Sequence, residues 1–150
     1  NMDGKLEKFE TVGADDSLLA TVFGACRDEL PNEFEALNFS GGIEAWMRGV
    51  FACNAYVDEQ APWALRKTDP ERMETVLATL YICIAQLAVA ISPVIPGSST
   101  KLLDTLGIPE DLRTIAGIRS HWYSPLAESD YRIIAPTPLF PRLELPAEPA

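Results

Sequence analysis

The stretch that decides the fold is residues 71–91, which read ERMETVLATLYICIAQLAVAI. Asp69 and Pro70, a cap residue and a proline suited to the first helical position, stand directly before it. Apolar side chains then recur at steps of four and three residues, the spacing of one helix face: Met73, Leu77, Leu80, Ile84, Leu87 and Ile91. The pattern predicts a long α-helix with an apolar seam.

A membrane span is the alternative interpretation of this helix. Residues 76–95 are almost wholly apolar and long enough to cross a bilayer. Gln86 in mid-segment, Pro93 near the end and the scarcity of basic flanking residues argue against a span. We therefore expect a helix buried in a soluble bundle, and no membrane partner.

Two earlier segments carry the same periodicity. The first follows possible cap residues at 15–17, and its seam consists of Leu19, Phe23, Cys26 and Leu30. The second begins near residues 38–40, and its seam consists of Ile43, Met47, Val50, Asn54 and Val57. Together with the helix after Asp69 they predict an all-α fold, an antiparallel helix bundle.

The C-terminal third is expected to contain one short helix and a tail. The helix fits residues 98–106, with Ser98 or Ser99 as its cap and Gly107 as its stop. Residues 115–118 can form a further helical turn, whereas six prolines after Ser124 exclude a long helix. We expect a proline-rich extended tail that packs across the bundle and frays at its last residues.

Composition and charge limit the possible functions. With 150 residues, 47% of them hydrophobic, the chain suits one globular domain. Cys26, Cys53 and Cys83 lie far apart inside apolar patterns, which predicts buried thiols in a reducing cytoplasm. The N-terminus does not resemble a signal peptide, which agrees with a cytoplasmic location. A net charge of −10 argues against binding nucleic acid mainly through phosphates, so any RNA contact must be local.

Residue types that would form an active site are scarce. The sole histidine, His121, has no second zinc-type ligand nearby, and a pairing with Ser124 lacks an identifiable orienting acid. Gly41 and Gly42 lie at a predicted helix, not in a phosphate-binding loop after a strand. The residues alone therefore predict no catalytic residue, no metal site and no cofactor in this chain.

Four segments nevertheless resemble, in order, those of one family. Residues 53–67, CNAYVDEQAPWALRK, resemble the segment A-N-x-Y-[IV]-[DE]-x-x-x-P-W-x-L-x-K of class I methionyl-tRNA synthetases. Residues 91–96 (ISPVIP), 102–107 (LLDTLG) and 138–144 (PLFPRLE) resemble the family segments P-x-[ML]-P, L-L-x-x-L-G and P-L-F-P-R-[IL]-E. The resemblance is to the C-terminal anticodon-binding domain of the bacterial enzymes, which join methionine to its tRNA with ATP.

The resemblance also implies that residues 1–150 form one helical-bundle domain of a larger chain. The H-I-G-H and K-M-S-K-S type signatures, with which the family forms methionyl-adenylate, do not occur here. Asn1 to Lys5 resembles the D-G-K-like turn that follows the family's anticodon-reading N-L-x-x-R helix, which would fall upstream. We expect the chain to be inactive alone, with ATP used by the parent enzyme and with the parent's catalytic domain as a partner.

In this family the domain reads the anticodon CAU of methionine tRNA, whose unpaired bases stack on aromatic or guanidinium planes. Trp63, after Pro62, matches the tryptophan that stacks on the first anticodon base, and Asp58 and Asn54 are further RNA-binding candidates. Two of these residues have a structural alternative. Trp63 can fill the end of the bundle where Pro62 stops the helix, and Asn54 can be a buried amide with satisfied hydrogen bonds. Phe140 can anchor the returning tail.

A structural interaction module without RNA contact is the rival function, and the charge of −10 favours it. Exposure of Trp63 distinguishes the two, since an exposed indole suits base stacking and a fully buried one leaves only a structural role. Trp122, a second loop indole, matches no family motif, and we expect it to pack against the tail.

Overall fold

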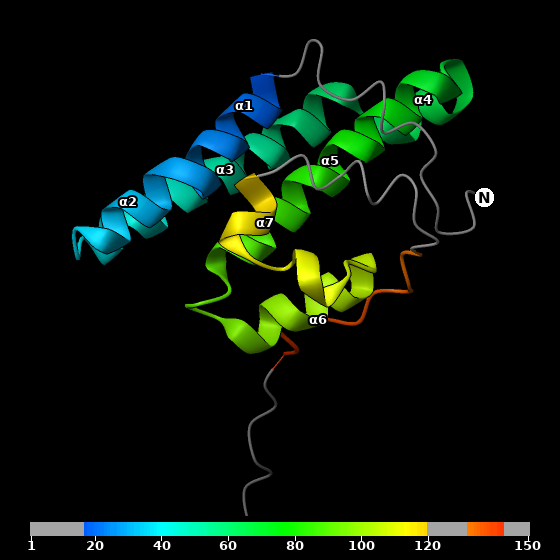
Figure 1. Cartoon of the computed structure of the whole chain (residues 1–150). Coiled ribbons are helices and arrows are strands. Elements are labelled where there is room, and N and C mark those ends of the chain that lie inside the picture. The colour runs from blue at the N-terminus through cyan, green and yellow to red at the C-terminus, as the bar shows by residue number, and fades with distance from the viewer. Residues whose placement is uncertain (1–16, 120–131, 143–150) are drawn as a thin grey trace, which may run out of the picture.

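The structure, a computed structural model, describes residues 17–119 and 132–142 of the chain, and this part contains helices and no strand. Figure 1 shows a first helical rod lying against α3, which returns in the opposite direction, and α5 running back along both. The predicted antiparallel all-α bundle is confirmed. Its elements are α1 (Ser17–Phe23), the π-helix η2 (Gly24–Glu29), α2 (Leu30–Glu35), α3 (Phe39–Gln60), α4 (Pro62–Thr68), α5 (Pro70–Ile91), α6 (Pro96–Leu106), the 3-10 turn η3 (Glu110–Leu112) and α7 (Ile115–Arg119).

The central helix of the bundle is α5. Asp69 caps it by accepting a hydrogen bond from the Arg72 backbone N–H at 3.0 Å, and Pro70 occupies its first position, both as expected. Among the described residues α5 is the one helix long and apolar enough to cross a membrane, but 78% of its most apolar window is buried inside the bundle. Since each buried large aliphatic side chain contributes ~1.5–3 kcal/mol, this helix supplies much of the core.

A π-helical segment joins α1 to α2, a feature that the sequence analysis did not predict. In it the Leu30 backbone N–H donates to the Ala25 carbonyl, five residues earlier, and Pro31 follows directly. A proline lacks the backbone donor, and in an α-helix its ring collides with the carbonyl four residues before it. The wider turn before Pro31 therefore lets the rod continue through a proline.

Buried polar groups connect this rod to α5. The Arg27 guanidinium lies 3.6 Å from the centroid of the Phe23 ring, and its Nε donates to Gln86 Oε1 at 3.1 Å. Gln86 in turn donates from Nε2 to the Ile118 carbonyl of α7 at 3.4 Å. Gln86 is thus a fully buried residue with partners on two sides, so a polar residue inside the apolar helix is compatible with the core.

The buried face of α3 differs from the predicted seam. It consists of Gly42, Ala45, Gly49, Cys53 and Tyr56. These residues are mostly small because the helices approach closely: a Cβ added at Gly49 would lie 3.0 Å from Leu87 Cδ2. The predicted seam lies on the flank, with Ile43, Met47, Val50 and Val57 half-buried and Asn54 exposed. The prediction was partly right, since Ile43, Val50 and Val57 pack against the core from this flank. It missed the fully buried face because periodicity alone favoured large side chains over small ones.

Helix ends follow local chemistry, with one correction. Asn38 caps α3 by accepting from the Gly41 N–H at 3.2 Å, and Gly107, with φ 70°, ends α6 as expected. Ser98 and Ser99 do not cap α6, because the helix begins earlier, with Pro96 at its first position. The expected turn at residues 115–118 is α7, and the cap candidates at 15 and 16 lie outside the described residues.

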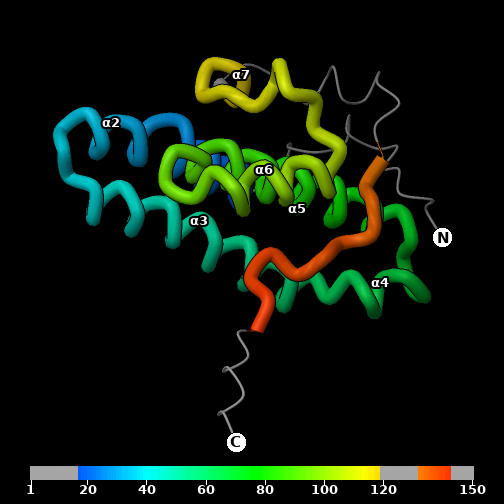
Figure 2. The backbone as a smooth tube through the Cα atoms, turned by 90° about the horizontal axis from the view of Figure 1, so that it is seen from below, coloured from blue at the N-terminus to red at the C-terminus, as the bar shows by residue number. Residues whose placement is uncertain are grey.

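The tail segment 132–142 contains no helix and crosses the end of the bundle from α6 toward α3 (Figure 2). The Ile134 N–H donates to the Thr105 carbonyl at 2.9 Å. Phe140 does not anchor the tail, since 72% of it is exposed, whereas its neighbour Leu139 is half-buried. The segments 120–131 and 143–150, with His121, Trp122, Ser124 and three of the tail's six prolines, lie outside the described residues, so the extended proline-rich tail stays a prediction there.

All three cysteines are buried free thiols, as expected. Burial raises the pKa of the Cys26 thiol to about 12, with a further rise from the neighbouring Cys53. The thiol therefore stays protonated at neutral pH and acts as a small apolar side chain.

Candidate nucleic-acid interface

The interface begins at the junction between α3 and α4. Ala61 adopts a left-handed conformation (φ 43°, ψ 61°), and its N–H donates to the Val57 carbonyl at 3.0 Å, which closes α3. Pro62 then opens α4 at a position where its missing N–H leaves no bond unmade. An alanine in this region is strained by ~1–2 kcal/mol, and the strained turn sets the direction in which α4 leaves.

Pro62 therefore separates two helices, and helical structure continues on both sides of it. Figure 2 shows α4 continuing the line of α3 along one edge of the bundle. Leu65 packs α4 against the core, and α4 contacts α5. At the same corner Arg72 donates from Nη2 to Gln60 Oε1 at 2.8 Å, which ties the start of α5 to the end of α3. The platform is thus held by packing and hydrogen bonds on both sides.

Trp63 projects outward from this platform. Its side chain is 63% exposed, although α4 as a whole is packed against α5. Exposure excludes the alternative in which the indole fills the end of the bundle. An exposed indole on a rigid helix presents a flat aromatic face that an unpaired base can stack on.

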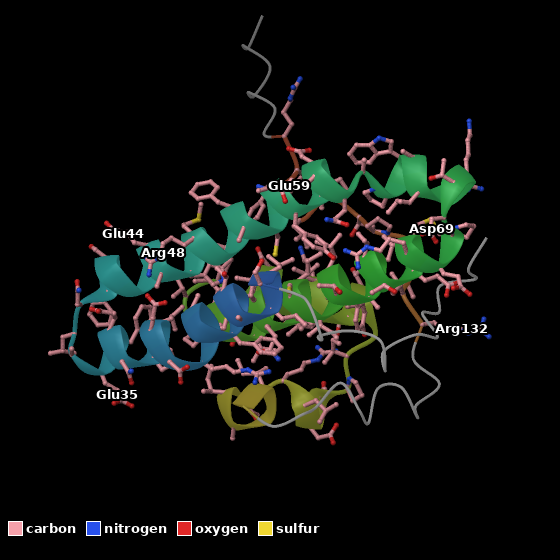
Figure 3. The ribbon with its side chains drawn as sticks, turned by 90° about the horizontal axis from the view of Figure 1, so that it is seen from above. Glu35, Glu44, Arg48, Glu59, Asp69 and Arg132 are labelled. Carbon is pink, nitrogen blue, oxygen red and sulfur yellow. The ribbon has the colours of Figure 1, made fainter. Side chains whose placement is uncertain are left out.

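Two cations accompany the indole. Arg66 and Lys67 lie three and four residues after Trp63, so the helix places them on the same face, and both are exposed. Glu59 and Asp69 lie at the two ends of α4, as Figure 3 shows. Arg66 and Lys67 thus place positive charge in the last turn of α4, with acidic side chains at both ends of the helix.

The other predicted residues lie on the outer side of α3 and at the junction. Asn54 and Asp58 are exposed and one helical turn apart, and Pro62 is half-buried beside Trp63. The favoured interpretation of Asn54 as a buried amide was wrong, because the side chain lies just outside the buried face centred on Cys53. Its amide has no hydrogen-bond partner in the described part of the chain, so both its donor and its acceptor are available to a ligand.

Sequence reasoning missed α4 as a helix, and with it the grouping of Trp63, Arg66 and Lys67. The signal was present, since a proline suits the first position of a helix as well as the position after one. Ala61 gave no warning, because the left-handed conformation that permits two consecutive helices normally favours glycine. Within the described residues no group of histidine, cysteine or acidic side chains could hold a metal ion.

Comparison with known proteins defines the class first. A family model described as the anticodon binding domain of methionyl tRNA ligase matches residues 10–140. This match covers most of the chain and includes the whole candidate interface, so the chain is by class an anticodon-binding domain of an aminoacyl-tRNA ligase. The chain belongs to the anticodon-binding domain family of methionyl-tRNA ligase.

Individual relatives agree with this assignment. The methionine–tRNA ligase of Mesorhizobium japonicum is 40% identical over an alignment of 111 positions that covers 67% of this chain and 20% of that protein. The enzyme of Brucella suis is 44% identical over 93 residues, 62% of this chain and 17% of that protein. The free-state crystal structure of Mycobacterium tuberculosis methionyl-tRNA synthetase has a TM-score of 0.77 at 28% identity, covering 97% of this chain and 29% of that chain. The chain spans about a fifth of the length of the curated relatives that it matches.

Proposed function

We propose that this domain binds the unpaired CAU anticodon of methionine tRNA, with Trp63 as the platform for the first anticodon base. The exposed indole on a rigid α4 is the observation that carries the proposal. Stacking of a base on an aromatic side chain contributes ~1–3 kcal/mol and needs no net positive charge. A chain with a net charge of −10 can therefore bind a loop of RNA at one edge.

The residues around Trp63 would orient the RNA. Arg66 and Lys67 can contact the phosphates next to the stacked base, while Asp58 repels phosphate and so favours base edges on the α3 side. Asn54, whose amide has no partner among residues 17–119 and 132–142, can donate to and accept from such a base edge. Pro62 fixes the backbone that carries the indole. The expected geometry has the bases toward the helix and the phosphates toward solvent.

We further propose that the domain, residues 1–150, works within a larger, cytoplasmic methionine–tRNA ligase. Its relatives are about five times longer than the matched segment, and one related structure is described as a complex with methionyl-adenylate. The parent enzyme would use ATP to form that intermediate in a separate catalytic domain. In this division of work the helical domain supplies recognition of the tRNA and no catalytic residue.

The proposal is tested by the affinity of the chain for a fluorescent stem-loop that carries the anticodon CAU. Trp63→Ala should weaken binding by about 5- to 150-fold, the equivalent of ~1–3 kcal/mol. Phe39→Ala is the matched control, since Phe39 is also a strongly exposed aromatic residue but lies at the opposite end of α3. Equal affinities of the Trp63 variant and the wild type would remove the role assigned to the indole.

Salt dependence provides an independent check. If Arg66 and Lys67 together neutralise about two phosphates, log K should fall with log salt at a slope of roughly −1.4. A stem-loop with a different anticodon should bind more weakly than the CAU loop. Absence of binding by the wild type, or affinity that does not depend on the anticodon, would favour the rival structural module.

A further inference from the structure

Cys53 and Cys83 face each other across the close contact between α3 and α5. The two helices run in opposite directions, and a Cβ added at Gly49 of α3 would lie 3.0 Å from Leu87 Cδ2 of α5. Cys53 lies one helical turn after Gly49, and Cys83 lies one turn before Leu87. The register of the antiparallel pair therefore places the two thiols side by side, and the Cys83 side chain is hydrogen-bonded to the Cys53 thiol.

Cys53 also borders an opening in the bundle. An apolar pocket of about 290 Å³ lies between α3, α5, α6 and the tail, and Cys53 is one of its lining residues. Cys53 is 7% exposed, whereas Cys26 and Cys83 are fully buried and do not line this pocket. A molecule little larger than water can therefore approach Cys53 from the pocket, while the other two thiols are shielded from it.

The acidity of Cys53 differs from that of Cys26. The hydrogen bond with Cys83 lowers the pKa of the Cys53 thiol, although burial acts in the opposite direction. Burial raises the pKa of Cys26 to about 12, so Cys26 stays protonated. Since the thiolate is the form of cysteine that attacks oxidants, Cys53 combines the reactive form with access, and Cys26 has neither.

We propose that Cys53 is a site of oxidation by small hydroperoxides, and that Cys83 converts the oxidised sulfur into a Cys53–Cys83 disulfide. In the first step the Cys53 thiolate attacks one peroxide oxygen, so that an S–O bond forms and the O–O bond breaks. The departing oxygen leaves as water after taking a proton, and Cys53 becomes a sulfenic acid. In the second step Cys83 sulfur attacks Cys53 sulfur, and the S–O bond breaks to release a second water. The two thiols are thus oxidised by two electrons, and hydrogen peroxide is reduced to two waters.

The lining of the pocket decides the class of oxidant. No charged side chain lines it, so an ionic oxidant would lose its hydration without a counter-charge, whereas a small neutral hydroperoxide would not. The thiols are not part of a metal site, because no group of three metal-binding side chains occurs within residues 17–119 and 132–142. Disulfides of cytoplasmic proteins are usually transient, so we expect thiol reductants to reverse this one.

Peptide mapping of the reduced, folded chain after treatment with hydrogen peroxide tests the proposal. Trypsin places each cysteine on its own peptide, since lysine and arginine residues bound the segments 9–27, 49–66 and 73–101. We expect one cross-link, between the peptides of Cys53 and Cys83, with a loss of two hydrogen atoms that dithiothreitol reverses. In concentrated urea this preference should disappear, and the three cysteines should join in mixed pairs.

Two variants separate the roles of the thiols. Cys83→Ala should abolish the cross-link and leave a sulfenic acid on Cys53 that dimedone captures. Cys26→Ala is the matched control, since it removes another fully buried cysteine, and it should form the Cys53–Cys83 cross-link as the wild type does. Circular dichroism checks that both variants keep the helical fold.

Three results would overturn the proposal: no cross-link in the folded wild type, a cross-link that includes Cys26, or mixed pairs like those formed in urea. A sulfenic acid that persists on Cys53 of the wild type would refute the role of Cys83. The site goes beyond the anticodon contact, and the Trp63 experiment uses neither thiol. Failure of the cross-link therefore leaves the anticodon proposal standing, and failure of the Trp63 variant leaves the cross-link standing.

Discussion

Replacing Gly107 by alanine tests how much the crossing of the tail over α6 stabilises the bundle. Gly107 ends α6 at φ 70°, and a Cβ built on it would lie 2.7 Å from the backbone oxygen of Arg132. A left-handed conformation costs an alanine ~1–2 kcal/mol, of which the stiffer unfolded chain recovers about 0.4–1 kcal/mol. The contact with a backbone atom must also be relieved by moving the tail.

Movement of the tail adds a second loss of stability. The hydrogen bond from the Ile134 N–H to the Thr105 carbonyl lies two residues from the clash and would weaken, at a cost of ~0.5–1.5 kcal/mol. The sum is about 2 kcal/mol, which for a domain of this size lowers Tm by roughly 4–8 °C. Thermal melts followed by circular dichroism measure the shift, and amide hydrogen exchange at Ile134 should become faster in the variant.

Gly97 provides the matched control on the same helix. A Cβ added there would meet nothing within 4 Å, and its φ is not positive. Gly97→Ala should therefore keep or slightly raise Tm, since alanine favours the helix. Equal melting temperatures for Gly97→Ala and Gly107→Ala, with unchanged exchange at Ile134, would refute the reasoning.

Three further variants test the remaining architecture. Ala61→Gly relieves the left-handed strain and should raise the free energy of unfolding by ~0.5–1 kcal/mol in urea titrations; a loss of stability would show that the conformation is not strained. Asp69→Ala removes the cap that accepts a hydrogen bond from the Arg72 N–H and should lower the free energy of unfolding by about 1 kcal/mol. An unchanged midpoint of the urea titration would contradict the capping role. Burial holds the pKa of Cys26 at about 12 against an ordinary 9.0, so the folded state keeps a proton that the unfolded state loses. The free energy of unfolding should fall as pH rises from about 9 to about 12, and Cys26→Ala should make this fall shallower; an identical pH profile would refute the assignment.

The boundaries that were predictable from sequence are those set by neighbouring residues. Asn38, Asp69 and Gly107 each act within a few residues of the backbone that they terminate, so their roles follow from local chemistry. The start of α6 was misplaced because two local signals competed there. Pro96 and Ser98 both favour a helix start, and the earlier proline prevailed.

The face of α3 could not be predicted, because it depends on its neighbours. Gly42, Ala45 and Gly49 carry little apolar surface, so a pattern of large side chains does not detect them. Their burial depends on the close approach of other helices, since Phe34 of α2 covers Gly42 and Leu87 of α5 occupies the space above Gly49. Because these small residues form the buried face of α3, Asn54 is exposed where it was expected in the core. Its candidate role therefore changes from a structural one to a binding one.

The family resemblance located the candidate site more reliably than the helical pattern did. The motif placed Trp63 and Pro62 in the site, and the structure shows the indole exposed. The grouping of Arg66 and Lys67 with the indole was missed, because it depends on their helical position relative to Trp63. The structure was needed to show that Pro62 begins a second helix and that Trp63, Arg66 and Lys67 share its outer face, although the residue types were already visible in the motif.

The π-helical segment before Pro31 also limits how this domain can change in evolution. A π-turn accommodates one residue more than the α-helix that it interrupts, so a one-residue deletion within Gly24–Glu29 would remove the interruption. Since the extra residue is absorbed inside the wider turn, α1 would keep its apolar face, with Leu18, Leu19 and Val22, directed toward α5 after such a deletion. Pro31 would then stand in a regular α-helix, where its ring collides with the carbonyl four residues before it. Among relatives, we therefore expect a one-residue deletion within residues 24–29 to occur together with replacement of Pro31.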